Sequence, residues 1–81
     1  YDNLNKWTKE DWIRTCYLYT CYCYINEIEV SNSILRDRFG VEEKNKSIVS
    51  RIIKETLNSK YIKLSDESAS PKMRRYIPYL T

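Results

Sequence analysis

The chain has 81 residues, which is enough for one domain with a small core, and 42% of them are hydrophobic, so a disordered chain is excluded. Because no apolar run approaches about 18 residues and no signal peptide is visible, the sequence predicts a cytoplasmic protein without membrane contact. The net charge of +3 is unevenly spread: residues 1–43 carry five basic and eight acidic groups, whereas residues 44–81 carry nine basic and three acidic groups. This basic second half favours a polyanionic partner, with nucleic acid ahead of an acidic membrane.

Residues 9–25 are predicted to form the first helix. Thr8 followed by Asp11 matches a capping box in which Asp replaces the usual Glu. The stretch CYLYTCYCYI also has strand propensity, but the length of the segment and its cap favour a helix. Seven positions at helical spacing make up its predicted buried face: Trp12, Ile13, Cys16, Tyr17, Thr20, Cys23 and Tyr24.

The opposite face of this first helix is apolar as well. Leu18, Tyr22 and Ile25 fall within about 60° of one another on the side away from the predicted core. So many exposed apolar side chains on a small domain predict a covering partner. We expect a second copy of the domain, as a homodimer, or the rest of a longer parent protein. The alternative is that residues Leu4 and Trp7 fold back over the patch within one chain.

Three cysteines, Cys16, Cys21 and Cys23, lie close together in a chain that has no histidine. This set cannot complete a four-ligand zinc site or a four-thiolate iron–sulfur cluster within one chain. Nucleophilic catalysis by Ser or Cys usually needs a positioned base, which is most often His. The sequence therefore predicts reduced thiols, no metal, no cofactor and no enzymatic activity.

The second helix is predicted to follow a very short strand at residues 28–30. Ser31 or Asn32 would cap its first turn, because both side chains accept hydrogen bonds from free backbone N–H groups. Its apolar side is Ile34, Leu35 and Phe39, and Arg36 and Asp37 are predicted to lie outside. Gly40, the single glycine, stands where a helix ends in the left-handed conformation.

The third helix is predicted over residues 45–59, with Asn45 as its cap. Apolar residues recur at the spacing that places them on one side of a helix. This buried side consists of Ile48, Val49, Ile52, Ile53 and Leu57. The exposed side consists of Ser47, Ser50, Arg51, Lys54 and Asn58, and its basic and hydroxyl groups are typical of a DNA-recognition helix.

Two further strands are predicted after the third helix. Residues 61–64 suit a strand, and in the segment 72–77 Met73, Arg75 and Ile77 alternate with their neighbours. The polar residues at about 65–72 would form a wing between these strands. The order of helix, strand, helix, helix, strand, wing and strand predicts an α+β fold, mainly α. The predicted architecture is a winged helix-turn-helix with three helices and a small two- to three-stranded antiparallel sheet.

Four segments together resemble a known family: IRTCYLYTCYCYI, SNSILRDRFGVEEKN, SRIIKETLNSKYIK and RRYIPY. They are similar to the C-terminal winged-helix domain of Schlafen/AlbA-type transcriptional regulators, bacterial proteins often labelled as related to the DNA helicase RecG. The resemblance implies that residues 1–81 are a single winged-helix domain from the C-terminal end of a larger protein, as does a chain that begins at Tyr1. That parent protein would bind ATP elsewhere, because a chain with one glycine has no phosphate-binding loop.

These observations predict a DNA-binding module of a transcription regulator. The third helix, residues 45–59, would enter the major groove with Asn45 and Arg51 at base edges, and the wing would lie on the DNA backbone. The predicted DNA-binding residues are Asn32, Ser33, Lys44, Asn45, Lys46, Ser47, Ser50, Arg51, Lys54, Lys72, Arg74 and Arg75. The alternative is a protein–protein assembly or dimerisation module without direct DNA contact, whose interface is Leu18, Tyr22 and Ile25.

Overall fold

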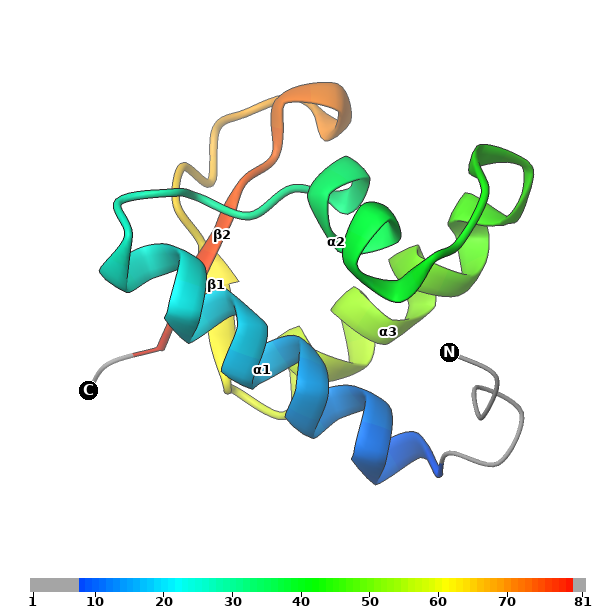
Figure 1. The fold of residues 1–81 in the computed structure, drawn as a ribbon. Coiled ribbons are helices and arrows are strands. Elements are labelled where there is room, and N and C mark those ends of the chain that lie inside the picture. Colours follow the sequence, from blue (N-terminus) through cyan, green and yellow to red (C-terminus); the bar gives the residue numbers. More distant parts are fainter. Residues whose placement is uncertain (1–7, 80–81) are drawn as a thin grey trace.

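The computed structural model describes residues 8–79 and has a small α+β fold that is mainly helical. The elements in chain order are α1 (Lys9–Ile25), α2 (Asn32–Phe39), the 3-10 helix η2 (Glu43–Asn45), α3 (Lys46–Asn58), β1 (Ile62–Leu64), the 3-10 helix η3 (Pro71–Met73) and β2 (Tyr76–Pro78). Figure 1 shows α1 along the lower edge and η3 at the top, with α2 and α3 between them. The three predicted helices and the predicted antiparallel strand pair are confirmed.

Local sequence sets most of the helix ends. The capping box of α1 is present, because the Thr8 hydroxyl accepts from the Asp11 backbone N–H at 3.1 Å and the Thr8 N–H donates to the Asp11 carboxylate at 3.0 Å. Ser31, rather than Asn32, caps α2 by accepting from the Ile34 N–H at 3.3 Å. Gly40 ends α2 with φ 68° and ψ 31°, the left-handed conformation that glycine adopts without steric cost.

The prediction that the Asn45 side chain caps α3 is wrong. Asn45 stands at the N-cap position, but its side chain accepts no cap hydrogen bond. The chain instead enters α3 through η2, in which the Asn45 backbone N–H donates to the Glu42 carbonyl at 2.9 Å. The turn of 3-10 helix gives Asn45 φ −109° and ψ 21°, outside the extended conformation from which a side-chain cap is usually made.

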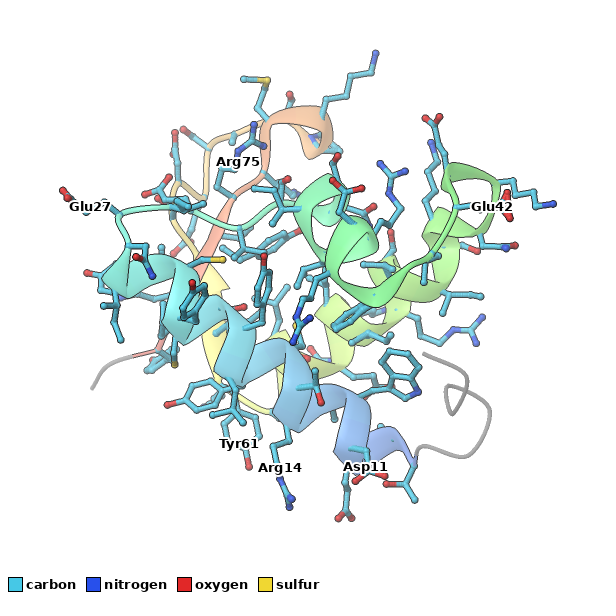
Figure 2. All side chains as sticks on the ribbon, in the orientation of Figure 1. Asp11, Arg14, Glu27, Glu42, Tyr61 and Arg75 are labelled. Atoms are coloured by element: carbon cyan, nitrogen blue, oxygen red, sulfur yellow. The ribbon has the colours of Figure 1, made fainter. Side chains whose placement is uncertain are left out.

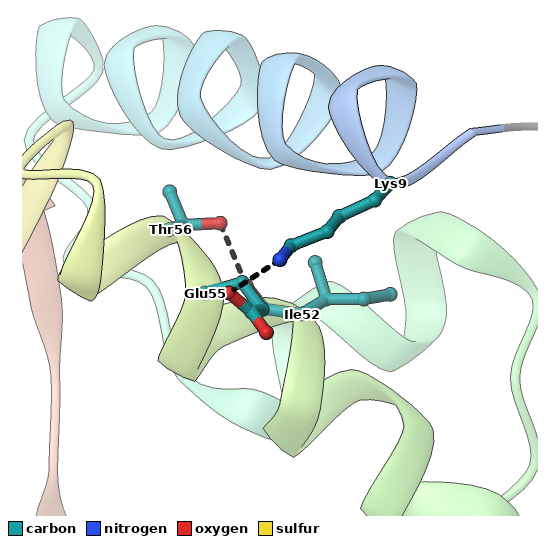
Figure 3. Close-up of polar contacts among 4 residues, drawn as sticks. All are labelled: Lys9, Ile52, Glu55 and Thr56. Atoms are coloured by element: carbon teal, nitrogen blue, oxygen red, sulfur yellow. Dashed lines mark hydrogen bonds and ion pairs between the residues drawn. The ribbon is translucent and has the colours of Figure 1, made fainter.

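The core lies where α1 crosses α3 and the sheet. Its buried side chains come from every main element: Ile13, Cys16, Cys23, Val30, Leu35, Phe39, Val49, Ile52, Ile53, Ile62 and Tyr76. Thr20 and Thr56 are also fully buried, and each hydroxyl donates back to a carbonyl of its own helix at 2.7 Å. At the edge of the contact, Lys9 of α1 forms an ion pair with Glu55 of α3 at 3.1 Å (Figure 3).

Two residues that were predicted to be buried are exposed. Tyr24 is 43% exposed, because it lies at the end of α1 beyond the contact that α1 makes with α3. Ile48 is 45% exposed. It belongs to the apolar stripe of α3 by spacing, but it lies about 90° from the centre of the buried positions around the helix axis. The apolar stripe of each helix is wider or longer than the contact between α1 and α3, so the residues at its edge stay exposed.

The antiparallel pair β1–β2 has the register Ile62↔Pro78, Lys63↔Ile77 and Leu64↔Tyr76. The strand predicted at residues 28–30 is reduced to a single bridge between Val30 and Tyr76, whose backbones exchange hydrogen bonds of 3.2 and 2.8 Å. The strand predicted across 72–77 begins only at Tyr76, because Pro71 starts η3, where its missing N–H and fixed φ are tolerated.

Within residues 8–79, no other element covers the outer face of α1. Leu18, Tyr22 and Ile25 are 57%, 62% and 79% exposed, which confirms that they face away from the core. The alternative cover, Leu4 and Trp7, lies outside the described residues. No helix within residues 8–79 is long and apolar enough to cross a membrane.

Candidate nucleic-acid interface

A groove of about 730 Å³ runs between the start of α2, the length of α3 and the segment that leads into β2. Its lining residues are Ser31, Asn32, Ser33, Arg36, Lys46, Ser50, Ile53, Lys54, Leu57, Pro71, Lys72, Arg74, Arg75 and Tyr76. Six of these side chains are basic, and none of the described lining residues is acidic. We call this surface the basic groove. Its charge comes from three segments that are far apart in the sequence.

Hydrogen bonds fix the wall of the basic groove that α2 and α3 share. The Asn32 amide nitrogen donates to the Ser50 hydroxyl at 3.0 Å, and the Arg36 Nε donates to the Asn32 amide oxygen at 2.7 Å. The first bond ties the two helices together, and the second holds the Arg36 side chain against this wall. A guanidinium that is already held in place loses less side-chain entropy when it binds an anion.

The start of α2 adds to the positive potential of the same wall. Ser31, Asn32 and Ser33 all line the groove, so the N-terminal end of this helix faces it. The first backbone N–H groups of a helix carry a partial positive charge and favour an anion nearby. The N-terminal end of α2 and the Arg36 guanidinium therefore both attract an anion to this wall of the groove.

The segment after η3 forms the opposite wall. Lys72, Arg74 and Arg75 line the groove here, and the Arg75 Nη1 donates to the Arg74 carbonyl at 3.0 Å. Figure 2 shows Arg75 beside η3, at the end of β2 that is closest to α2. Because β2 pairs with β1 at Leu64 and with Val30 by its bridge, the backbone beneath these basic residues is held on both sides.

Tyr76 is buried at the base of the basic groove. Burial raises the pKa of its hydroxyl above the ordinary value of 10.0, and the nearby Arg74 opposes this shift. The phenol therefore stays neutral at physiological pH, so it adds no negative charge among the cations. A neutral phenol can also donate a hydrogen bond to an anion.

The structure brings eight of the twelve predicted DNA-binding residues together. Asn32, Ser33, Lys46, Ser50, Lys54, Lys72, Arg74 and Arg75 all line the basic groove. Lys44, Asn45 and Ser47 are exposed at the start of α3, outside the groove. Lys44 lies 4.0 Å from the carboxylate of Glu42, in the turn at the right of Figure 2.

Arg51, one of the two predicted base-reading residues, lies on another flank of α3. It lines a separate hollow of about 280 Å³ with Lys9, Trp12, Ile13, Ile48, Ile52 and Glu55. The adjacent positions Ser50 and Arg51 differ by about 100° around the helix axis, and Arg51 is the one that is turned away from the groove. Ser50 and Lys54 face it instead.

Arg36 is the residue of the basic groove that the sequence reasoning missed. It was predicted to lie outside, but it is half-buried and hydrogen-bonded to Asn32. A signal was present, because positions 32 and 36 are one helical turn apart and share a face. If Asn32 belongs to the site, then Arg36 belongs to it as well.

Nothing among residues 8–79 gathers three His, Cys, Asp or Glu side chains that could hold a metal ion. Comparison with known proteins gives no further guidance: no protein-family model, no curated protein and no solved structure matches the chain. The resemblance of the sequence to the Schlafen/AlbA-type regulators therefore stays a prediction.

Proposed function

We propose that this domain is a winged helix-turn-helix module that binds duplex DNA through the basic groove. The observation that carries the proposal is the convergence of six basic side chains from α2, α3 and the segment 72–75 on one groove. Lys and Arg side chains that neutralise phosphates supply most of the affinity of such proteins for DNA. The proposed parent protein is a transcription regulator that carries this module at one end.

The order of the elements supports the winged-helix part of the proposal. A short turn with Gly40 joins α2 to α3, and β1 and β2 form a hairpin whose connecting residues lead back to the groove. In a helix-turn-helix the first helix of the pair crosses the DNA backbone and the second enters the major groove. The N-terminal end of α2 and the Arg36 side chain would then hold one phosphate, and Lys72 and Arg74 would hold another.

The residue of α3 proposed to contact DNA most closely differs from the one that the sequence predicted. Ser50 is bonded to Asn32, and Lys54 lies one turn further along the same flank. We therefore propose Lys54, rather than Arg51, as the residue of α3 that makes the closer DNA contact. Arg51, Lys44, Asn45 and Ser47 would lie at the margin and add only long-range attraction.

A titration with a short duplex at several salt concentrations tests this function. With four to six phosphate contacts, the plot of log affinity against log salt should have a slope of roughly −4 to −5. The isolated domain should bind arbitrary duplexes with a dissociation constant of about 1–100 µM at physiological salt. An affinity that does not change between low and physiological salt would rule out binding through the basic groove.

A further inference from the structure

We infer that the outer face of α1 is a self-association surface, on which a second copy of this chain packs its own α1 in the antiparallel direction. This surface consists of Arg14, Leu18, Cys21, Tyr22 and Ile25 and ends at Glu27; we call it the α1 face. It shares no residue with the basic groove, and Figure 1 places α1 and η3 at opposite edges of the molecule. The inference stands whether or not the protein binds DNA.

The spacing of the exposed side chains matches a helix-pairing seam. Arg14, Leu18, Cys21 and Ile25 follow one another at intervals of four, three and four residues, which is the alternation that keeps a stripe facing a second helix. Leu18 and Ile25 are 57% and 79% exposed, although both are large and apolar. A lone surface helix of a small domain has no need of such a seam.

A hollow of about 580 Å³ lies beside this seam, lined by Thr15, Leu18, Tyr19, Tyr22 and Arg38. Two ring contacts order its floor: the Arg38 guanidinium lies 5.4 Å from the centre of the Tyr19 ring, and the Tyr19 and Tyr22 rings stack at 6.1 Å. A neighbouring helix can insert an apolar side chain here without reordering these rings. Preformed hollows of this kind reduce the entropy that binding costs.

The charges identify the occupant as a second copy in the antiparallel direction. No charged residue occurs between Arg14 and Glu27, so two copies of this face bring no like charges together. Figure 2 shows Arg14 and Glu27 at the two ends of the face, both directed away from the body of the protein. In an antiparallel pair each Arg14 lies beside Glu27 of the other copy, whereas a parallel pair would place Arg14 beside Arg14.

The C-terminal end of α1 supports the same arrangement. The last turn of α1 carries no basic residue, so the partial negative charge of its carbonyl groups is not offset within the helix. An antiparallel copy supplies its Arg14 at this end. The midpoint of positions 14 and 27 and the midpoint of positions 18 and 25 fall on either side of Cys21, so a twofold axis near Cys21 brings Arg14 close to Glu27, and Leu18 close to Ile25, of the other copy.

A charge-complementation experiment tests this inference on the whole 81-residue chain. In sedimentation, the wild type should dimerise with a dissociation constant of about 1–100 µM, as small interfaces do. Arg14→Glu alone and Glu27→Arg alone should each raise this constant at least about tenfold, because each creates two like-charge contacts in a twofold dimer. An equimolar mixture of the two variants should dimerise again, since each substituted side chain then meets a residue of opposite charge in the other copy.

Both substituted positions are fully outside the core, and unchanged circular dichroism confirms that each variant is folded. A wild type that stays monomeric up to about 1 mM overturns the inference. So does a mixture of the two variants that associates no better than either variant alone, because another cover for α1 would not require this pairing. The further variant Leu18→Glu places a charge in the apolar part of the α1 face. It should prevent dimerisation on its own, and it should also prevent dimerisation of the mixture when both charge variants carry it.

Discussion

Helices α1 and α3 have the same kind of inner face and opposite outer faces. Each buries one threonine at their contact, Thr20 or Thr56, whose hydroxyl donates to a carbonyl of its own helix at 2.7 Å. On the outside, α1 presents Leu18 and Ile25, whereas α3 presents Lys54. The inner faces resemble each other because both must fill one dry core. The outer faces are free of that constraint, and they differ as the two proposed partners, duplex DNA for α3 and a second copy for α1, would require.

The largest expected effect is a difference in the free energy of unfolding between a variant on the inner face of α3 and one on its outer face. Ile53→Ala should lower the free energy of unfolding by about 2–5 kcal/mol, because it leaves a cavity at a side chain that is almost fully buried. The adjacent Lys54→Ala should change it by no more than about 0.5 kcal/mol, since this side chain is exposed. Urea denaturation of both variants measures this, and equal losses would contradict the division of α3 into two faces.

A second prediction concerns the outer face of α3 and the wall opposite to it. The double variant Lys54→Glu/Arg74→Glu should weaken duplex binding by roughly 100-fold or more, because two charge-assisted contacts of about 1.5–3 kcal/mol each are lost. Its matched control is Lys60→Glu/Lys63→Glu, which changes the net charge equally at two exposed residues outside the basic groove.

The control variant Lys60→Glu/Lys63→Glu should weaken duplex binding far less than the groove variant Lys54→Glu/Arg74→Glu. The loss of affinity in Arg51→Glu should lie between these two losses. Filter binding or fluorescence anisotropy at one low salt concentration is sufficient for this comparison. If the control and the groove variant lose the same affinity, net charge rather than the basic groove governs binding. If Arg51→Glu loses more than Lys54→Glu, then the duplex lies on the other flank of α3.

The smallest expected effect is on the inner faces and depends on pH. Burial is the main cause that raises the pKa of Cys16 above its ordinary value of 9.0, and burial also raises the pKa of Tyr76. The folded state then holds these protons more tightly than the unfolded state. Their contribution is fully present below about pH 9 and is lost as the pH rises toward the higher folded pKa values.

Urea denaturation between about pH 8 and about pH 10 should therefore show decreasing stability. Cys16→Ala should flatten this decrease in part, and the raised pKa values of Tyr19 and Tyr76 should account for part of what remains. Leu18→Ala is the control, because this exposed side chain on the outer side of α1 does not titrate. An equal pH dependence in all three proteins would mean that the buried thiol between α1 and α3 is not responsible.

The features that sequence predicted correctly depend on residues close together in the chain. The capping box of Thr8 and Asp11, the Ser31 cap and the end of α2 at Gly40 each involve only a few neighbouring positions. The apolar outer face of α1 was also readable, because helical spacing alone separates Leu18 and Ile25 from the core side. Within one helix, relative direction follows from geometry.

Tertiary structure alone decided which outer flank of α3 becomes part of a site. Sequence spacing places Ser50, Arg51 and Lys54 together on the exposed side, but only Ser50 and Lys54 face α2 and the segment before β2. That choice depends on how the buried side chains of α2 pack on those of α3, and the Asn32–Ser50 hydrogen bond joins the two helices across 18 positions of the chain. The inclusion of Arg36 has the same cause. Periodicity gives directions around one helix axis, and only packing relates one axis to another.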